Sequence, residues 1–213
     1  MPQSLFTVAI IAYLYMLRRL IQQRLGLPEI IVMLLLIALT MDNLILVLGN
    51  AFIDTTGYQY ASWFRFFAHA LVLPLLMQAV LAVAARAGVT WAARRDVQII
   101  TGLIVVAAIL FGMITEVIGL QLVEAELMGH LRLVSADAHP PFATIFTNIV
   151  VLLVAIPIWR RAGWPWLFAG SLAIFLINGA AGATDYGILA GNAAEILFAA
   201  CWVATLYRFP VSD

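Results

Sequence analysis

Residues 30–49 read IIVMLLLIALTMDNLILVLG, and Asp42 is the one charged residue in this stretch. A helix of about 20 apolar residues is long enough to cross the hydrocarbon core of a bilayer. Water cannot satisfy the backbone inside that core, so a segment that spans it must pair its own N–H and C=O groups, as a helix does. The stretch therefore predicts a membrane-spanning α-helix, with lipid as the solvent of the fold.

The composition of the whole chain supports the same interpretation. Of its 213 residues, 65% are hydrophobic and 10% are charged, whereas a soluble domain carries about 25% charged residues. The formal net charge is zero, which argues against a nucleic-acid partner because no basic excess offsets phosphate charge. The single cysteine, Cys201, can form no intrachain disulfide, and its apolar surroundings predict a small buried hydrophobic residue.

Further apolar runs of similar length follow along the chain and predict an all-α, polytopic integral membrane protein. Together they give a seven-transmembrane helix bundle that forms a single domain over residues 1–213. The connections are short, apart from one of about twenty residues between the fourth and fifth runs. The predicted spans are residues 5–16, 30–49, 63–85, 99–120, 142–158, 164–181 and 188–206.

The arginines predict how the bundle is oriented, because loops rich in Lys and Arg stay on the cytoplasmic side. With seven spans, nine of the eleven arginines fall on one side, and Arg65 and Arg132 fall on the other. This asymmetry predicts an N-terminus outside and a C-terminus inside. The complete absence of lysine is typical of a GC-rich bacterial genome, so we expect a multi-pass protein of the bacterial inner (plasma) membrane.

Buried polar side chains are costly in a bilayer, so their depth points to function. Counted at about 1.5 Å per residue, the ionisable and amide side chains of six spans fall in the outer half of the bundle. The inner half has only milder polar groups such as Gln78, Thr101 and Ser171. The outer set predicts a polar cavity formed by Asp42, Asn43, Arg65, His69, Glu116, Thr144, Thr147, Asn148, Asn178, Asn192 and Glu195.

The residue types in this layer suggest chemical roles. Asp42, Glu116 and Glu195 would repel one another if all were ionised in a low dielectric, so we expect a proton or a cation among them. Carboxylates in different protonation states are what general acid and base catalysis uses, and His69 is suited to relay protons. In this hypothesis Arg65 meets an anionic head group, and Asn43, Asn148, Asn178 and Asn192 orient the ligand.

A metal site is not predicted. Zinc normally requires two or more His or Cys ligands, and His69 is the one histidine within a predicted span. His130, Asp137 and His139 in the long outer connection form a second candidate set, but we interpret that connection as a solvated loop. The sequence gives no indication of a cofactor.

Two local patterns bear on how the cavity is built. Pro74 cannot donate to the carbonyl of Ala70, so we expect a kink in the third span beside His69. Gly112, Glu116 and Gly119 share one helix face, and small residues beside a carboxylate allow a neighbouring helix to approach closely.

The function that these features favour is binding, with processing left open, of a small or lipid-like molecule in the outer-half cavity. Membrane lipids and other membrane proteins are the expected partners. Two alternatives stay open: a non-catalytic subunit of a larger membrane complex, and a proton-coupled transporter. If the polar groups serve only helix packing, they should hydrogen-bond one another.

The architecture resembles two known seven-helix families, although the residues depart from both. Microbial rhodopsins attach retinal to a lysine in the last helix, and this chain has no lysine. Zinc amidases similar to alkaline ceramidase need three histidines near the membrane site, including a pair in the last helix, and residues 188–206 contain none. Because the chain has no lysine, a covalent retinal pigment is excluded.

Overall fold

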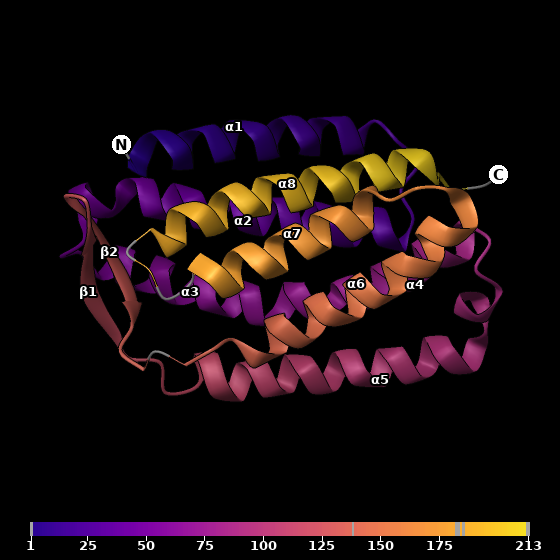
Figure 1. Cartoon of the computed structure of the whole chain (residues 1–213). Helices are drawn as coiled ribbons and strands as arrows, with labels where there is room; N and C mark the ends of the chain where they lie inside the picture. The colour runs from indigo at the N-terminus through magenta and orange to yellow at the C-terminus, as the bar shows by residue number, and fades with distance from the viewer. Residues whose placement is uncertain (1, 138, 182–183, 185, 212–213) are drawn as a thin grey trace.

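The computed structural model describes residues 2–137, 139–181, 184 and 186–211. The chain is almost entirely helical, with one small sheet (Figure 1). The elements are α1 (Pro2–Ile21), α2 (Leu27–Phe52), α3 (Thr56–Val72), the 3₁₀-helix η1 (Leu73–Leu75), α4 (Leu76–Arg86), the 3₁₀-helix η2 (Thr90–Ala93), α5 (Arg95–Gly112), the π-helix η3 (Met113–Val117), β1 (Leu122–Leu127), β2 (His130–Ser135), α6 (Phe142–Ala162), α7 (Trp166–Ala181) and α8 (Gly187–Arg208).

Six helical segments of the described chain are long and apolar enough to cross a membrane. Two of them are composite: α3, η1 and α4 form one segment over Thr56–Arg86, and α5 continues into η3 to give Arg95–Val117. The remaining helix, α7, has 16 residues, so it is about 24 Å long at 1.5 Å per residue. These helices pack as a bundle that is compatible with a membrane protein.

The two ends of the bundle differ. The hairpin end, where α1 begins, carries β1 and β2, whereas α8 ends at the opposite end (Figure 1). Nine arginines lie at that opposite end, which we call the arginine end. They are in the last turns of α1, α4, α6 and α8, at the start of α5, and in the α1–α2 connection, and they are Arg18, Arg19, Arg24, Arg86, Arg94, Arg95, Arg160, Arg161 and Arg208.

Apolar side chains cover the outside of the bundle. On α5, which runs along one edge (Figure 1), Leu103 is 67% exposed and Leu110 is 57% exposed. Conversely, Asp42 and Asn43 in the middle of α2 are buried. A bundle with apolar groups outside and polar groups inside is expected where lipid is the solvent.

Close helix contacts depend on small residues. A Cβ atom on Gly170 of α7 would lie 2.7 Å from Cys201 Cβ on α8, so these helices touch where glycine leaves room. Cys201 is buried, as predicted. A Cβ atom on Gly112 would lie 3.3 Å from that of Ala70, which confirms the expected close approach at Gly112.

The predicted role of Gly119 in that packing is wrong. Nothing lies within 4 Å of a Cβ built on Gly119, and the residue has φ +79° beyond the end of η3. Glycine tolerates this left-handed conformation, so Gly119 ends the segment instead of packing it. At Pro74, where a kink was predicted, the third segment changes from α-helix to the 3₁₀-helix η1.

The long connection is not the expected solvated loop. It forms an antiparallel hairpin in which Leu122 pairs with Ser135 and Leu127 pairs with His130. Asn50 at the end of α2 holds the hairpin, because its Nδ2 donates to Gly129 O at 3.1 Å and its Oδ1 accepts from Leu131 N at 2.6 Å. The hairpin thus rests on the end of α2.

His130 is buried, contrary to the prediction for the loop, and is 2% exposed. Its Nε2 contacts Leu46 O at 2.5 Å, and its ring packs on Phe6. His139 instead bonds to Thr115 O at 3.0 Å. The described residues contain no group of three or more potential ligands placed to hold a metal, so the candidate set of His130, Asp137 and His139 is not assembled.

Candidate functional site

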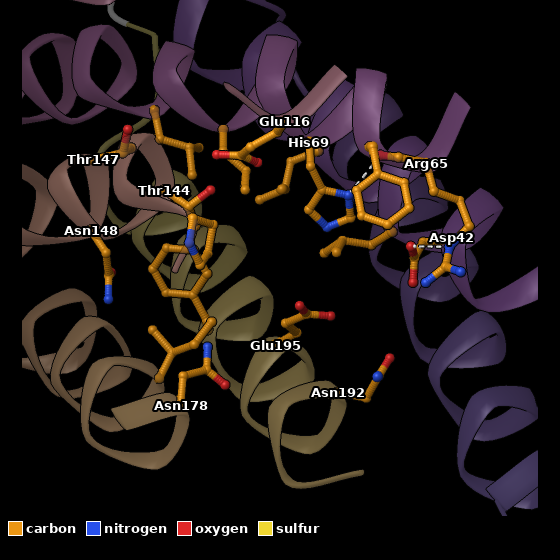
Figure 2. Close-up of a pocket in the computed structure, with 18 of the residues that line it drawn as sticks. Asp42, Arg65, His69, Glu116, Thr144, Thr147, Asn148, Asn178, Asn192 and Glu195 are labelled. Carbon is orange, nitrogen blue, oxygen red and sulfur yellow. Dashed lines mark hydrogen bonds and ion pairs between the residues drawn. The ribbon is translucent and has the colours of Figure 1, made fainter. Parts of the chain in front are cut away.

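A cavity of about 340 Å³ lies in the half of the bundle nearer the hairpin end. Polar side chains from α2, α3, η3, α6, α7 and α8 line it (Figure 2). It therefore brings together residues that are far apart in sequence. The predicted residues in its wall are Asp42, Arg65, His69, Glu116, Thr144, Thr147, Asn148, Asn178, Asn192 and Glu195.

Asn43 is the predicted ligand-binding residue that does not line the cavity. Its side chain is fully buried, and its Nδ2 donates to Leu39 O one turn earlier in α2 at 2.9 Å. Asp42 and Asn43 are consecutive, and consecutive helix positions point about 100° apart. Of the two, Asp42 lines the cavity and Asn43 does not.

Arg65 and Asp42 form an ion pair in the cavity wall. Arg65 Nε donates to Asp42 Oδ1 at 2.7 Å, and the two side chains are 12% and 10% exposed. Water screens such a pair little, so its charges interact strongly. Arg65 Nη1 is buried and has no hydrogen-bond partner among the described residues.

His69 presents one ring nitrogen to the cavity (Figure 2). Its Nδ1 lies 2.9 Å from Arg65 O, one turn earlier in α3. Because a carbonyl oxygen can only accept, Nδ1 must carry the proton of this hydrogen bond. In the neutral ring, Nε2 is then an acceptor that can take a proton from a molecule in the cavity.

Glu195 and Glu116 reach the cavity from α8 and η3. Glu195 makes no hydrogen bond to any described residue, and its carboxylate points toward the middle of the labelled side chains (Figure 2). Glu116 lies in the π-helical turn, where Ile118 N donates to Met113 O at 2.9 Å. Glu116 Oε1 is buried without a partner in the described chain. Single π-turns in helices are frequent at functional sites.

Asn148 and Asn192 line the cavity, and each amide group is held by a backbone carbonyl. Asn192 Nδ2 donates to Ile188 O at 2.8 Å, and Asn148 Nδ2 donates to Ser171 O at 3.4 Å. A backbone carbonyl cannot donate, so these contacts fix each amide with its Oδ1 on the other side. Both Oδ1 atoms are buried and have no partner within the described residues. Asn178, by contrast, is an exposed lining residue near the end of α7.

The cavity has an apolar floor that the sequence did not reveal. Each floor residue shares a helical segment with a polar lining residue and lies one or two turns nearer the arginine end than that polar residue. In sequence, these apolar residues look the same as residues that face lipid, so no sequence signal distinguished the floor from the lipid-facing surface. The floor consists of Leu35, Leu39, Leu73, Leu76, Val151, Ile174 and Phe198.

A second cavity of about 230 Å³ adjoins the first one toward the hairpin end. Phe66, Glu116 and Pro141 line both cavities. Asp137 and His139, next to the hairpin, line the second. Glu116 thus lies where the two cavities meet, on the side of the first cavity that is nearer the hairpin end.

Together these features define a helical bundle of membrane type with a polar cavity in one half and an apolar floor beneath it. No known protein family, curated protein or solved structure matches the chain. Any functional conclusion therefore rests on the cavity itself.

Proposed function

We propose that the chain is a seven-span protein of the bacterial plasma membrane, with α7 as a span and the hairpin end outside. Nine arginines at one end support this orientation through the positive-inside rule. The composition of α7 supports its role as a span, because WLFAGSLAIFLINGAA contains no charged residue. A helix somewhat shorter than the hydrocarbon core is accommodated by local thinning of the bilayer.

We further propose that the cavity binds a small or lipid-like molecule. The observation that carries this proposal is a set of four buried polar atoms in the cavity residues without partners in the described chain. Buried polar atoms are hydrogen-bonded in the great majority of cases, so a molecule held in the cavity can supply the partners that these atoms lack. The four atoms are Arg65 Nη1, Glu116 Oε1, Asn148 Oδ1 and Asn192 Oδ1.

The same groups are suited to acid and base chemistry on the bound molecule. His69 and Glu195 line one cavity, and a histidine that shares a site with a carboxylate is a common means of moving protons. In this extension, Glu116 and Glu195 act as acid or base, and the Arg65–Asp42 pair provides a fixed electrostatic environment. The proposal of binding does not depend on catalysis.

The apolar floor argues against the transporter alternative. Leu35, Leu76 and Val151 line the cavity on the side of the arginine end, and coupled transport normally needs a site near the midplane that both sides reach in turn. The subunit alternative predicts instead that the polar residues hold helices together and that no small molecule occupies the cavity.

The test is to purify the protein in a mild detergent and identify bound small molecules by native mass spectrometry. We expect one compound to be retained by the parent and lost from Asn192→Leu, which removes an unpaired buried acceptor. Glu124→Gln, on the exposed face of the hairpin, is the matched control and should retain it. Identical compounds at equal occupancy in all three folded proteins would contradict the proposal.

A further inference from the structure

Among the four buried polar atoms of the cavity residues that have no partner in the described chain, three are acceptors and one, Arg65 Nη1, is a donor. Asn148 and Asn192 each direct Nδ2 into backbone carbonyls and leave Oδ1 unpartnered within the described residues. Glu195 and Glu116 add carboxylate oxygens to the wall. Asn192 is buried, with only 5% of its surface exposed, so water does not readily replace the missing partner of its Oδ1. A molecule that satisfies this wall must therefore bring donors.

The charges of the lining residues also favour a ligand that brings hydrogen-bond donors. Asp42 offsets the charge of Arg65 through their 2.7 Å contact, and within the described residues neither Glu116 nor Glu195 forms an ion pair with an arginine. Arg132 does not line the cavity. Two carboxylates in a low dielectric favour a bound proton or cation.

The layering and size of the cavity restrict the molecule further. Polar groups lie toward the hairpin end, and Leu35, Leu76 and Val151 lie beneath them. At ~30 Å³ for each water-sized group, a volume of about 340 Å³ holds roughly eleven non-hydrogen atoms. A short amphiphile with its polar head toward the hairpin end meets these limits.

We propose that the cavity takes a single-chain amphiphile with a primary ammonium head. The ammonium lies beside Glu195 and Asn192, which are three residues apart and share one face of α8, and the chain lies against the apolar floor. An ammonium has three donors and no acceptor, so it matches both the acceptor excess and the negative charge. The inference rests on the proposed binding function and specifies its ligand class.

The test compares three probes with the same ten-carbon chain: decylamine, decanol and decanoate. Binding to the protein in phosphatidylcholine nanodiscs is measured by equilibrium dialysis with labelled probes, against empty nanodiscs. We expect decylamine to bind about tenfold or more tightly than either other probe. Its charged hydrogen bonds are worth more than the neutral ones of decanol, and the carboxylates of the wall repel decanoate. Decanoate or decanol binding as tightly as decylamine would overturn the ammonium assignment while supporting a ligand cavity.

A variant locates the head group. Glu195→Gln should weaken decylamine binding about tenfold and leave decanol unchanged, whereas Glu124→Gln on the exposed hairpin should change neither. Decylamine affinity that is unaltered in folded Glu195→Gln protein would overturn the assignment to this site. If that variant does not fold, the probe ranking on the parent protein decides. Absence of specific binding by all three probes would count against both the ligand class and the binding function.

Discussion

Arg65 Nε and Asp42 Oδ1, separated by 2.7 Å, tie α3 to α2 at the wall of the polar cavity. The pair uses one edge of the guanidinium and leaves Nη1 buried without a partner in the described chain. Asp42 already offsets the charge of Arg65, and the sequence-based hypothesis that Arg65 meets an anionic head group stays a prediction. The ion pair therefore gives the first prediction.

Removing one partner of this pair should destabilise the protein more than removing both. Arg65→Met leaves Asp42 as an unpaired buried charge, which costs about 3 to 5 kcal/mol. The double variant Arg65→Met with Asp42→Leu should recover most of that loss, because apolar replacements of a buried pair are often neutral. Equilibrium unfolding in mixed micelles measures the difference.

The control for that cycle is the exposed pair of Arg94 and Asp96 at the arginine end, where the side chains are 65% and 55% exposed. Arg94→Met should leave the unfolding curve unchanged, since exposed ion pairs contribute little. Equal losses at the two sites would mean that the Arg65–Asp42 pair is solvated and that the cavity is not a low-dielectric site.

Replacing carboxylates by amides should have opposite effects at two positions. Asp42→Asn removes the charge that pairs with Arg65 and should lower the melting temperature. Glu195→Gln should keep or raise it, because Glu195 makes no hydrogen bond to a described residue and its amide avoids the cost of a buried charge. Thermal unfolding in detergent checks both, and a larger loss for Glu195→Gln would contradict the geometry of the cavity.

The contact between α7 and α8 should tolerate no added atom at Gly170. A Cβ at this position would lie 2.7 Å from Cys201 Cβ, so Gly170→Ala should cost about 1 to 3 kcal/mol through overpacking. Adding Cys201→Gly should restore part of the lost stability, as measured by unfolding in mixed micelles. Gly102→Ala is the matched control, because nothing lies within 4 Å of a Cβ at that helical glycine.

The hairpin should loosen when its anchor is removed. Asn50→Ala deletes two hydrogen bonds to the hairpin, at Gly129 O and Leu131 N, and each contributes about 1 kcal/mol. We expect faster amide hydrogen exchange at Leu131 and faster tryptic cleavage after Arg132. Gln59→Ala, an exposed glutamine on α3, should change neither rate. Unaltered exchange in Asn50→Ala would mean that other contacts hold the hairpin.

The proposed orientation predicts which positions are reached from outside the cell. A cysteine at the exposed Asp137 should react with a membrane-impermeant maleimide in intact cells, and a cysteine at Arg94 should react only after lysis. The native Cys201 is buried and should not interfere. A C-terminal reporter should be active in the cytoplasm. Labelling at Arg94 but not at Asp137 in intact cells would reverse the orientation.

The sequence alone was sufficient for the class of fold. Runs such as residues 30–49 can only be stable in lipid as helices, because the bilayer offers no partner to an unpaired backbone. Their length and the helical rise also predicted the depth of Asp42, Glu116 and Glu195, whose side chains line one cavity in the structure. Depth follows from local geometry, so it can be read without tertiary contacts. Whether these residues bind a ligand stays a prediction.

Tertiary structure decided which way each polar side chain faces and which residue it contacts, because neither follows from the geometry of a single helix. Rotation about α2 separated Asn43 from the cavity although Asp42 beside it faces inward, and pairing between distant helices joined Arg65 to Asp42. The hairpin that buries His130 depends on contacts with α2, which lies more than eighty residues earlier. The apolar floor differs from lipid-facing leucines only in its neighbours. Sequence determined how deep each side chain lies, and packing between helices determined the direction it faces and the partner it meets.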